Sequence, residues 1–457
     1  LSFDLRGLRI RLKRHESLRL KSGSFSLANL ETAGSDSFAV PAFSAENFKI
    51  NLQNLRMSLA GNLPVNVRDV HFSFKNFTAK SAGELVGKTW SAGNFETNLH
   101  TVRLTLKNNK LLDVRSGDFS LQNFLLKGNP RLGEATLSAA DLRLDLKAFY
   151  LGIEKMSPLV VGDAGLSVKN IKLAQPGGDP FHDIFVRSLT ASKQNGTMKL
   201  TGFALKPKYS KRIFPKKTVQ KLTRKDFELP ELIFRGVNFE RLLKGELVAQ
   251  RLLISNPRFD AFQDRNSPDD FSTYKQLPQE QLRKSSVTIH LDTVLLTDGS
   301  VHFEEIAPGK WTPGVVEFSS IQVTALNLSN DPANIRRNPV MPVTMKGKFQ
   351  KQAWLSSRFE MDLSSPNDAF TCQGSAEPMS FGLFNGFLLP SYNFHFEGGE
   401  ILKMEYSFRA DNRSATGKMN LQYQGLDVAV QNDANEKKRL LSEFAELVML
   451  IKNNRRS

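Results

Sequence analysis

One segment of the chain carries glycine, lysine and threonine in an order that suits phosphate binding. Gly83, Gly87, Lys88 and Thr89 match the end of a P-loop, whose backbone N–H groups and lysine cradle phosphates. That motif needs four residues between its first glycine and the Gly-Lys-Thr, and only three separate Gly83 from Gly87. The residues after Thr89 continue as a strand pattern where a P-loop would begin a helix. The spacing therefore argues against a nucleotide site.

The histidines and the cysteine show no metal-binding or catalytic pattern. No two of the seven histidines have the i, i+4 spacing of a helical zinc site, and His71, His290 and His302 fall within alternating runs. Cys372 is the only cysteine, which excludes an internal disulfide and a thiolate metal site. No Gly-x-Ser-x-Gly elbow is present. We therefore expect no catalytic residue, metal or cofactor, and a protein that is not an enzyme.

Composition indicates a folded, basic protein that is rich in phenylalanine. Of 457 residues, 40% are hydrophobic, and there are 34 Phe against 6 Tyr and 3 Trp. Phenylalanine has no polar group, so these rings need apolar surroundings, which a β-rich core or a lipid-lined cavity would provide. The net charge of +16 is compatible with anionic membranes, acidic glycans or nucleic acid.

The positive charge is concentrated at residues 193–225, which hold eleven Lys or Arg and no acidic residue. Two interpretations remain open. The run is a solvated loop that keeps sheet edges apart, or it contacts anionic lipid head groups. Few aromatic residues accompany it, and no nucleic-acid motif does, so we expect no nucleic-acid partner. The candidates for head-group contact are Lys206, Lys208, Lys211, Arg212, Lys216 and Lys217.

The chain contains an internal repeat. Residues 1–77, shifted by 94 positions without a gap onto residues 95–171, are identical at 21 of 77 positions. A fixed period predicts an array of stacked units, each too open to bury its apolar face alone. Such arrays present long continuous surfaces.

Alternating apolar and polar residues predict strands with one apolar and one wet face. We expect turns at Ser22-Gly23, Ser116-Gly117 and Asp298-Gly299, and hence antiparallel meanders. Short helices are expected at 239–244 and 274–284, and an amphipathic helix at 435–453. The apolar positions expected to line a groove are Leu8, Ile10, Leu12, Phe25, Leu27, Phe48, Ile50, Leu52, Phe72, Phe74, Leu104, Leu106, Phe119, Leu121, Leu142, Leu144 and Leu146.

These patterns divide the chain into six segments. We expect β repeat units at 1–94 and 95–188, a third unit with the basic insertion at 189–262, a connection at 263–284, a divergent β region at 285–433, and a C-terminal helix and tail at 434–457. The helices are too few to cover about 25 strands. Sheets of that size curl, split or close. The expected fold is mainly β: an elongated, curled antiparallel sheet, or repeating β-groove, with few short helices and a C-terminal amphipathic helix.

Several local patterns carry a resemblance to a known family. They are a strand–Asp-Gly–strand pattern at 294–303, a strand that ends in Asn-Pro at 252–259, the segment 370–390 with Asn385, and the strand at 417–423. On these patterns the chain resembles the AsmA-like family of repeating-β-groove proteins, which are related to TamB. The resemblance implies a periplasmic protein of a diderm bacterium that is anchored in the inner membrane. The chain starts at Leu1 inside a strand pattern, so we expect a fragment or a processed form whose missing N-terminus carries the membrane helix that the resemblance implies.

Two functions remain open from the sequence. The first is a lipid-transfer conduit that carries phospholipid acyl chains along a hydrophobic β-groove between inner and outer membranes, or supports outer-membrane biogenesis, with an outer-membrane protein partner at the C-terminus. The second is a structural or adhesive β protein with a dry core of facing sheets and no lipid cargo. The first requires that the alternating apolar residues face a space that hydrocarbon can occupy.

Overall fold

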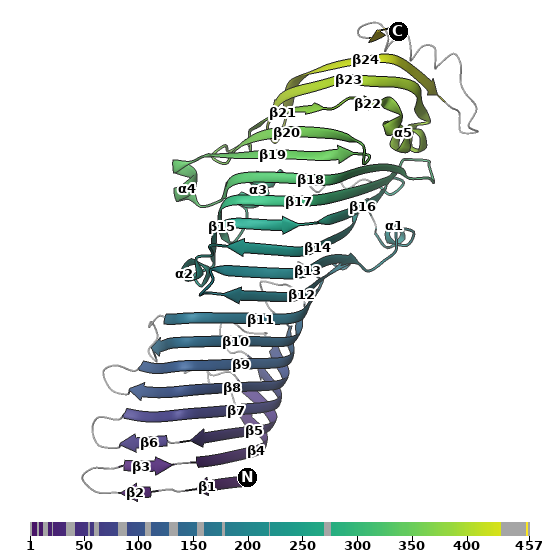
Figure 1. Cartoon of the computed structure of the whole chain (residues 1–457). Coiled ribbons are helices and arrows are strands. Elements are labelled where there is room, and N and C mark those ends of the chain that lie inside the picture. Colours follow the sequence, from purple (N-terminus) through teal and green to yellow (C-terminus); the bar gives the residue numbers. More distant parts are fainter. Residues whose placement is uncertain are drawn as a thin grey trace. The chain divides into compact units, whose positions relative to one another are not determined.

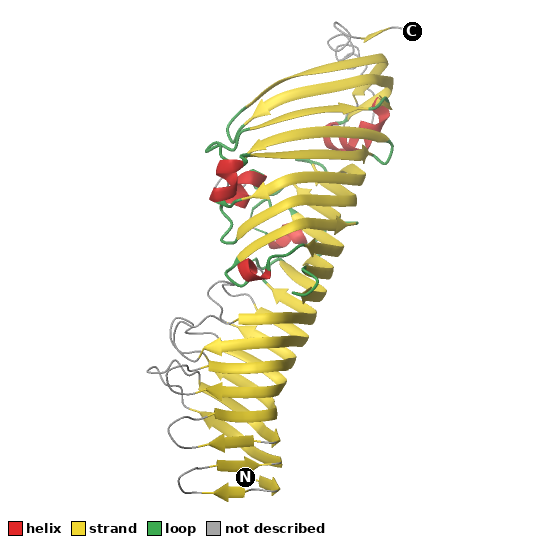
Figure 2. Cartoon of the chain, turned by 60° about the vertical axis from the view of Figure 1, so that its left-hand side comes forward, coloured by secondary structure: helices red, strands yellow, loops and turns green. Residues whose placement is uncertain are grey.

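The fold is mainly β with few short helices, as the alternation predicts (Figure 1, Figure 2). The computed structural model describes residues 2–6, 9–11, 17–20, 22–32, 42–53, 55–58, 64–80, 89–105, 111–127, 136–152, 160–175, 179–218, 220–268, 276–430 and 454–455. The chain divides into two compact units, Leu1–Phe203 and Ala204–Ser457.

The first unit is an antiparallel meander of long strands. The order of paired strands is β1, β4, β5, β7, β8, β9, β10, β11, β12, while β2, β3 and β6 pair beside them. The strands are β1 (Ser2–Arg6), β2 (Arg9–Arg11), β3 (Ser17–Leu20), β4 (Ser22–Thr32), β5 (Ala42–Gln53), β6 (Leu55–Ser58), β7 (Pro64–Lys80), β8 (Thr89–Thr105), β9 (Leu111–Lys127), β10 (Thr136–Gly152), β11 (Val160–Ala174), β12 (His182–Ser192) and β13 (Thr197–Pro207), which carries the unit boundary.

The pairing register of this unit repeats at half of the 94-residue period seen in the sequence. The same pair of positions recurs in every second strand pair, so the repeating module is one hairpin of two strands. The recurring pairs are Phe25 with Ile50, Phe72 with Thr97, Phe119 with Leu144, and Leu166 with Ala191. Equivalent residues of successive modules therefore lie in one row across the strands of the sheet.

Residues with left-handed backbone recur at the same half-period within the strands. Asn123 in β9 and Asn170 in β11 have φ values of 53° and 52°. In the sequence, Asn29 and Asn76 precede them at the same spacing. A left-handed residue inside a strand bends the strand locally, and asparagine tolerates that conformation better than most residues. The repeated bend favours a curled sheet over a flat one.

Replacing Asn170 by valine is expected to destabilise the protein by about 1 kcal/mol, because a β-branched residue pays the full cost of the left-handed conformation. The Asn170 side chain is exposed, so lost packing contributes little. Urea unfolding measures the effect. Asn170→Gly is the control and should retain wild-type stability, since glycine adopts positive φ freely. Equal stability of the valine variant and the wild type would contradict this explanation.

The second unit combines a mixed sheet with short helices at its ends. Its strands are β14 (Arg224–Arg235), β15 (Glu246–Ser255), β16 (Arg258–Asp264), β17 (Thr288–Ile306), β18 (Gly314–Ser329), β19 (Val340–Phe349), β20 (Ala353–Asp362), β21 (Phe370–Ala376), β22 (Met379–Ser380), β23 (Phe394–Ala410), β24 (Ala415–Val430) and β25 (Asn454–Arg455). Its helices are α1 (Phe214–Lys217), α2 (Phe239–Leu242), α3 (Pro278–Arg283), α4 (Pro332–Arg337), η3 (Phe381–Phe384) and α5 (Asn385–Tyr392).

The sheet of the second unit departs from the expected antiparallel pattern at β17. This strand pairs in parallel with both β15 and β16. The two strands lie end to end beside β17, with β15 along its first half and β16 along its second. The break between them is Asn256-Pro257, and the predicted turn at Asp298-Gly299 is a bulge inside β17 beside it. The Asn256 N–H donates to the Thr297 carbonyl at 2.9 Å. Two of the four patterns that carry the family resemblance, those at 252–259 and 294–303, are therefore neighbours in the sheet.

Other local predictions have mixed outcomes. The predicted turns at Ser22-Gly23 and Ser116-Gly117 are wrong, because these residues lie inside β4 and β9. The helices predicted at 239–244 and 274–284 correspond to α2 and α3, and α3 begins at its proline. The helix predicted at 435–453 lies outside the described residues. The six predicted segment boundaries stay a prediction.

Candidate functional site

The first unit carries three rows of mainly apolar residues on one face of its sheet. Strand register aligns the residues of each row, and residues two apart on a strand share a face. The first row is Phe48, Phe74, Phe95, Leu121, Leu142, Val168 and Leu189. The second row is Phe25, Ile50, Phe72, Thr97, Phe119, Leu144, Leu166 and Ala191. The third row is Leu52, Val70, Leu99, Gly117, Leu146 and Ala164.

Most side chains of the three rows are half-buried. The half-buried members include ten predicted groove residues: Phe25, Phe48, Ile50, Phe72, Phe74, Phe119, Leu121, Leu142, Leu144 and Leu146. Among the row members whose burial the structure describes, Val70, Thr97, Gly117 and Val168 are fully buried, and the side chains of Val70, Thr97 and Val168 are 6%, 5% and 8% exposed. Residues between two packed layers of a sandwich would be buried throughout. The described part of the unit therefore leaves this apolar face partly open.

Aromatic rings join along the rows at the N-terminal side of the unit. The ring centroids of Phe48 and Phe74 lie 4.6 Å apart, and those of Phe74 and Phe95 lie 5.4 Å apart. Phe25 contacts Phe48 edge-on at 6.3 Å. Such ring pairs stabilise a sheet beyond the area they bury. Here they also make the apolar surface continuous from one strand to the next.

The opposite face of the same strands is polar. Asn98 lies between His71 and Asp118, with its amide oxygen 2.6 Å from the His71 Nδ1 and its amide nitrogen donating to Asp118 at 2.8 Å. A second cross-strand bond joins Asn94 to Gln122 at 3.0 Å. Cross-strand pairs of this kind stabilise a face that water contacts. The sheet thus has one wet face and one apolar face, as a groove requires.

The remaining predicted groove residues are not all described. Leu8, Leu12 and Leu106 lie outside the described residues. Ile10, Leu27, Leu52 and Leu104 lie on described strands, but their side chains are not described. The rows also contain Phe95, Leu99, Leu166, Val168 and Leu189, which were not among the predicted groove residues. The half-period would have found them, because each lies one hairpin module after a residue already chosen.

The second unit has an open groove of about 910 Å³ that the sequence analysis did not predict. Its lining comes from β18, β19, β20, β21, β23 and β24 and includes Met345, Met419 and the hydroxyl groups of Ser357 and Tyr406, which hydrogen bond at 2.7 Å. Gly374 also lines it, and a Cβ there would collide with the Tyr406 ring. The charged lining residues are Lys346, Arg358, Lys418 and Glu405, so cations exceed anions.

Helices η3 and α5 cover one part of the second unit's core. Phe381 packs against Phe396, with ring centroids 4.8 Å apart, and Phe384 lies 5.0 Å from Phe349. Asn385 fixes this segment, because its amide donates to the Phe396 carbonyl and accepts from the Phe396 N–H, both at 2.8 Å. The asparagine noted in the sequence thus has a structural role, which is to hold the helical cover against β23.

The six basic residues predicted to contact head groups divide into two kinds. Lys206 binds Asp226 and Glu228, and Lys211 lies 3.3 Å from Asp260 and 3.1 Å from Glu304. Burial alone would lower the pKa of Lys206, but its carboxylate partners outweigh burial and raise that pKa. These two lysines are paired with carboxylates and are not available as isolated charges. The run at 193–225 is also not one solvated loop, because it includes β13, α1 and the first residues of β14. The exposed ones are Lys208, Arg212, Lys216 and Lys217, and Lys217 lies 5.9 Å from the Tyr209 ring.

A charged cluster surrounds His302 on β17. Its Nε2 lies 2.8 Å from Glu304 and its Nδ1 lies 2.9 Å from Glu317. Burial alone would lower the pKa of His302, but these hydrogen bonds outweigh burial and the pKa is raised. Asp260 adds attraction, while Lys211 and Lys351 bind the two glutamates from outside. The cluster ties the basic insertion to the sheet.

The stability of the second unit is expected to depend on pH through His302. Because the pKa of His302 is higher in the folded than in the unfolded state, the protonated ring stabilises the fold. This stabilisation is complete below pH 6.5, the unfolded pKa, and is lost as the pH rises through the folded pKa. His302→Gln should remove that slope and cost about 1 kcal/mol at pH 6. Urea unfolding of both proteins across this pH range measures it. An unchanged slope in the variant would assign the dependence to another group.

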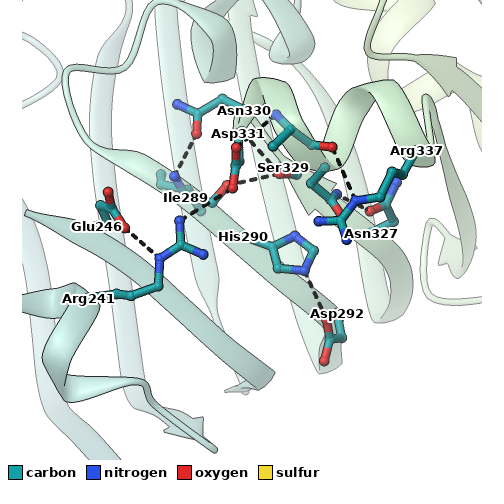
Figure 3. A network of polar contacts seen from close by, with 12 residues as sticks. Arg241, Glu246, Ile289, His290, Asp292, Asn327, Ser329, Asn330, Asp331 and Arg337 are labelled. Atoms are coloured by element: carbon teal, nitrogen blue, oxygen red, sulfur yellow. Dashed lines mark hydrogen bonds and ion pairs between the residues drawn. The ribbon is translucent and has the colours of Figure 1, made fainter.

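A polar network joins α2, β15, β17 and α4 at one end of the second unit (Figure 3). Arg241 donates to Glu246 at 2.5 Å and lies 3.4 Å from Asp331. Asp331 caps α4 by accepting from the Ala333 N–H at 2.9 Å. His290 lies 3.1 Å from Asp292 in the same view. The partners of Arg241 and Asp331 are structural, since they fix helix ends and loops.

The described residues contain no group of three or more His, Cys, Asp or Glu that could hold a metal ion. In the same part of the chain, no helix is long and apolar enough to cross a membrane. No protein-family model matches the chain, and no curated protein matches it either. The features of the site are the apolar rows of the first unit, the groove of the second unit, and the exposed residues Lys208, Arg212, Lys216 and Lys217.

Proposed function

We propose that this chain is a lipid-transfer conduit of the AsmA-like type, which carries phospholipid acyl chains along apolar β-sheet faces. The observation that carries the proposal is the half-buried state of the three apolar rows in the first unit. Large apolar side chains that remain partly open to water gain free energy when hydrocarbon covers them, at about 0.8 kcal/mol for each buried CH₂. An acyl chain provides many such groups.

The regularity of the rows supports movement as well as binding. Each hairpin module presents an apolar residue at the equivalent position of the sheet, as Phe72, Phe119 and Leu166 do in successive modules. Successive sites on such a face have nearly equal affinity for an acyl chain. A ligand that meets equal sites crosses small barriers between them, whereas one deep pocket would retain it.

The charge of the protein suits an anionic or zwitterionic phospholipid. The head group would stay in water at the open side of the apolar face, with basic side chains nearby. In the second unit, Lys346, Arg358 and Lys418 line the groove together with the Ser357 and Tyr406 hydroxyls. These groups suit a phosphate or an ester oxygen, while Met345 and Met419 suit the chain.

The proposal includes a location and partners. Transfer between two membranes places the protein in the periplasm of a diderm bacterium, anchored in the inner membrane. It would then contribute to outer-membrane biogenesis, with an outer-membrane protein as partner at the C-terminal end. The family resemblance supports this part.

Lipid extraction and native mass spectrometry of the purified full chain test the proposal. The expected result is phospholipid bound to the protein at one or more molecules per chain. A lipid-free and fully stable monomer would overturn it and would support a structural or adhesive protein instead. Crosslinking from a photoreactive residue at position 121 tells a ligand on the apolar face from lipid carried elsewhere.

A further inference from the structure

The hairpin between β17 and β18 presents a tryptophan almost completely to solvent. Trp311 is 92% exposed, the highest value among the exposed large hydrophobic residues of the described chain. Tryptophan is usually well buried, because its ring is the largest apolar side chain. Packing within the fold therefore does not explain a tryptophan at this position.

The tip of this hairpin is fixed by hydrogen bonds from outside it. Asn266 accepts from the Gly309 N–H at 2.7 Å and donates to the Lys310 carbonyl at 3.2 Å. Ala307 is buried, and the Lys310 N–H donates to its carbonyl at 3.0 Å. Trp311 therefore projects from a fixed backbone, and little backbone entropy is lost when a partner binds it.

A second exposed aromatic residue lies on the neighbouring segment. Lys310 Nζ donates to Asn393 at 3.0 Å, which joins the hairpin to the end of α5. Tyr392, the last residue of α5, is 54% exposed. Lys310, Trp311 and Tyr392 are called the aromatic tip below. No acidic residue occurs at 306–314 or at 385–393.

We propose that the aromatic tip binds the interfacial layer of a membrane that contains anionic phospholipid. Tryptophan and tyrosine favour this layer because their rings are apolar while the indole N–H and phenol O–H remain hydrated. Lysine adds attraction to anionic head groups. The net charge of +16 favours binding to such a surface. This inference does not rest on the proposed lipid transfer.

Fluorescence of Trp311 tests the contact directly. The chain has two other tryptophans, so Trp90→Phe and Trp354→Phe leave Trp311 as the only reporter. Vesicles of phosphatidylglycerol mixed with phosphatidylcholine should shift its emission to shorter wavelength, and brominated acyl chains should quench it. Phosphatidylcholine alone should give a weaker effect. An emission spectrum that the mixed vesicles leave unchanged would overturn the proposal and would point to a protein partner for this tryptophan.

Vesicle flotation of variants separates the tip from other surfaces. Trp311→Ala should lower the partition coefficient onto mixed vesicles, obtained by flotation at several lipid concentrations, roughly tenfold, which corresponds to about 1.4 kcal/mol. Leu243→Ala is the matched control, since Leu243 is also highly exposed, at 70%, and should leave binding unchanged. Leu144→Asp, which targets the apolar rows, should also still bind. Wild-type binding by Trp311→Ala would overturn the proposal, whatever the result for lipid transfer.

Discussion

Replacement of Leu144 by aspartate is expected to remove most of the bound phospholipid while the chain stays folded. Leu144 lies in the second row between Phe119 and Leu166 and is half-buried. The new carboxylate stays hydrated in the free protein, so the folding cost is small. A passing acyl chain would have to desolvate it, which costs several kcal/mol. Lipid per chain, measured by extraction, should fall at least tenfold, on the order of 1.4 kcal/mol or more.

The polar face of the same strands provides a matched control. Ser167 pairs with Arg143 and with Thr190 on the face opposite the rows. Ser167→Asp adds the same charge to the same sheet, next to an arginine, and should leave bound lipid at the wild-type amount. If both variants keep their lipid, the ligand does not use the rows. If both lose it, net charge and not position determines binding.

Replacement of Arg283 by leucine is expected to destabilise the second unit by about 3 kcal/mol or more. Asp368 is completely buried, and its Oδ1 lies 2.8 Å from the Arg283 guanidinium. Removing one partner of a buried ion pair leaves an unpaired buried charge, which is among the most damaging single changes in a protein. Arg283 also donates to the Ser365 carbonyl at 3.1 Å, a bond that the leucine loses. Urea unfolding measures the loss.

The double variant Arg283→Leu with Asp368→Asn separates charge from packing. Asparagine removes the unpaired charge and keeps the shape, so it should recover at least half of the lost stability. The Gln279 side chain donates to the Asp368 backbone carbonyl at 2.7 Å and should hold this loop in both variants. Equal stability of the single and double variants would show that the ion pair contributes little and that α3 packs through other contacts.

The sequence predicted the class of the fold because period-2 alternation is a local signal. Phe48, Ile50 and Leu52 alternate with polar residues, and any sheet that uses this strand must put them on one face. Helix α3 was also predictable, since Pro278 favours a first helical position. Local signals of this kind depend on neighbouring residues alone.

Features that depend on pairing could not be predicted in the same way. Asp298-Gly299 has the composition of a turn and of a bulge, and the partners of β17 decide between them. The parallel pairing of β17 with β15 and β16 has no local signature. The groove beside Tyr406 combines residues of six strands, so it exists only once their register is set. The half-period was present in the sequence at Asn29, Asn76, Asn123 and Asn170, but the longer alignment concealed it.

The one-hairpin module of the first unit has a consequence for how such a protein can change in size. Since every module meets the next with the same register, removal or duplication of a whole hairpin rejoins the strands without a slip. Descendants of one ancestral gene can therefore differ in reach by whole hairpins while every surviving strand keeps its neighbours. The length of such a sheet is then a heritable quantity that changes in steps of one hairpin.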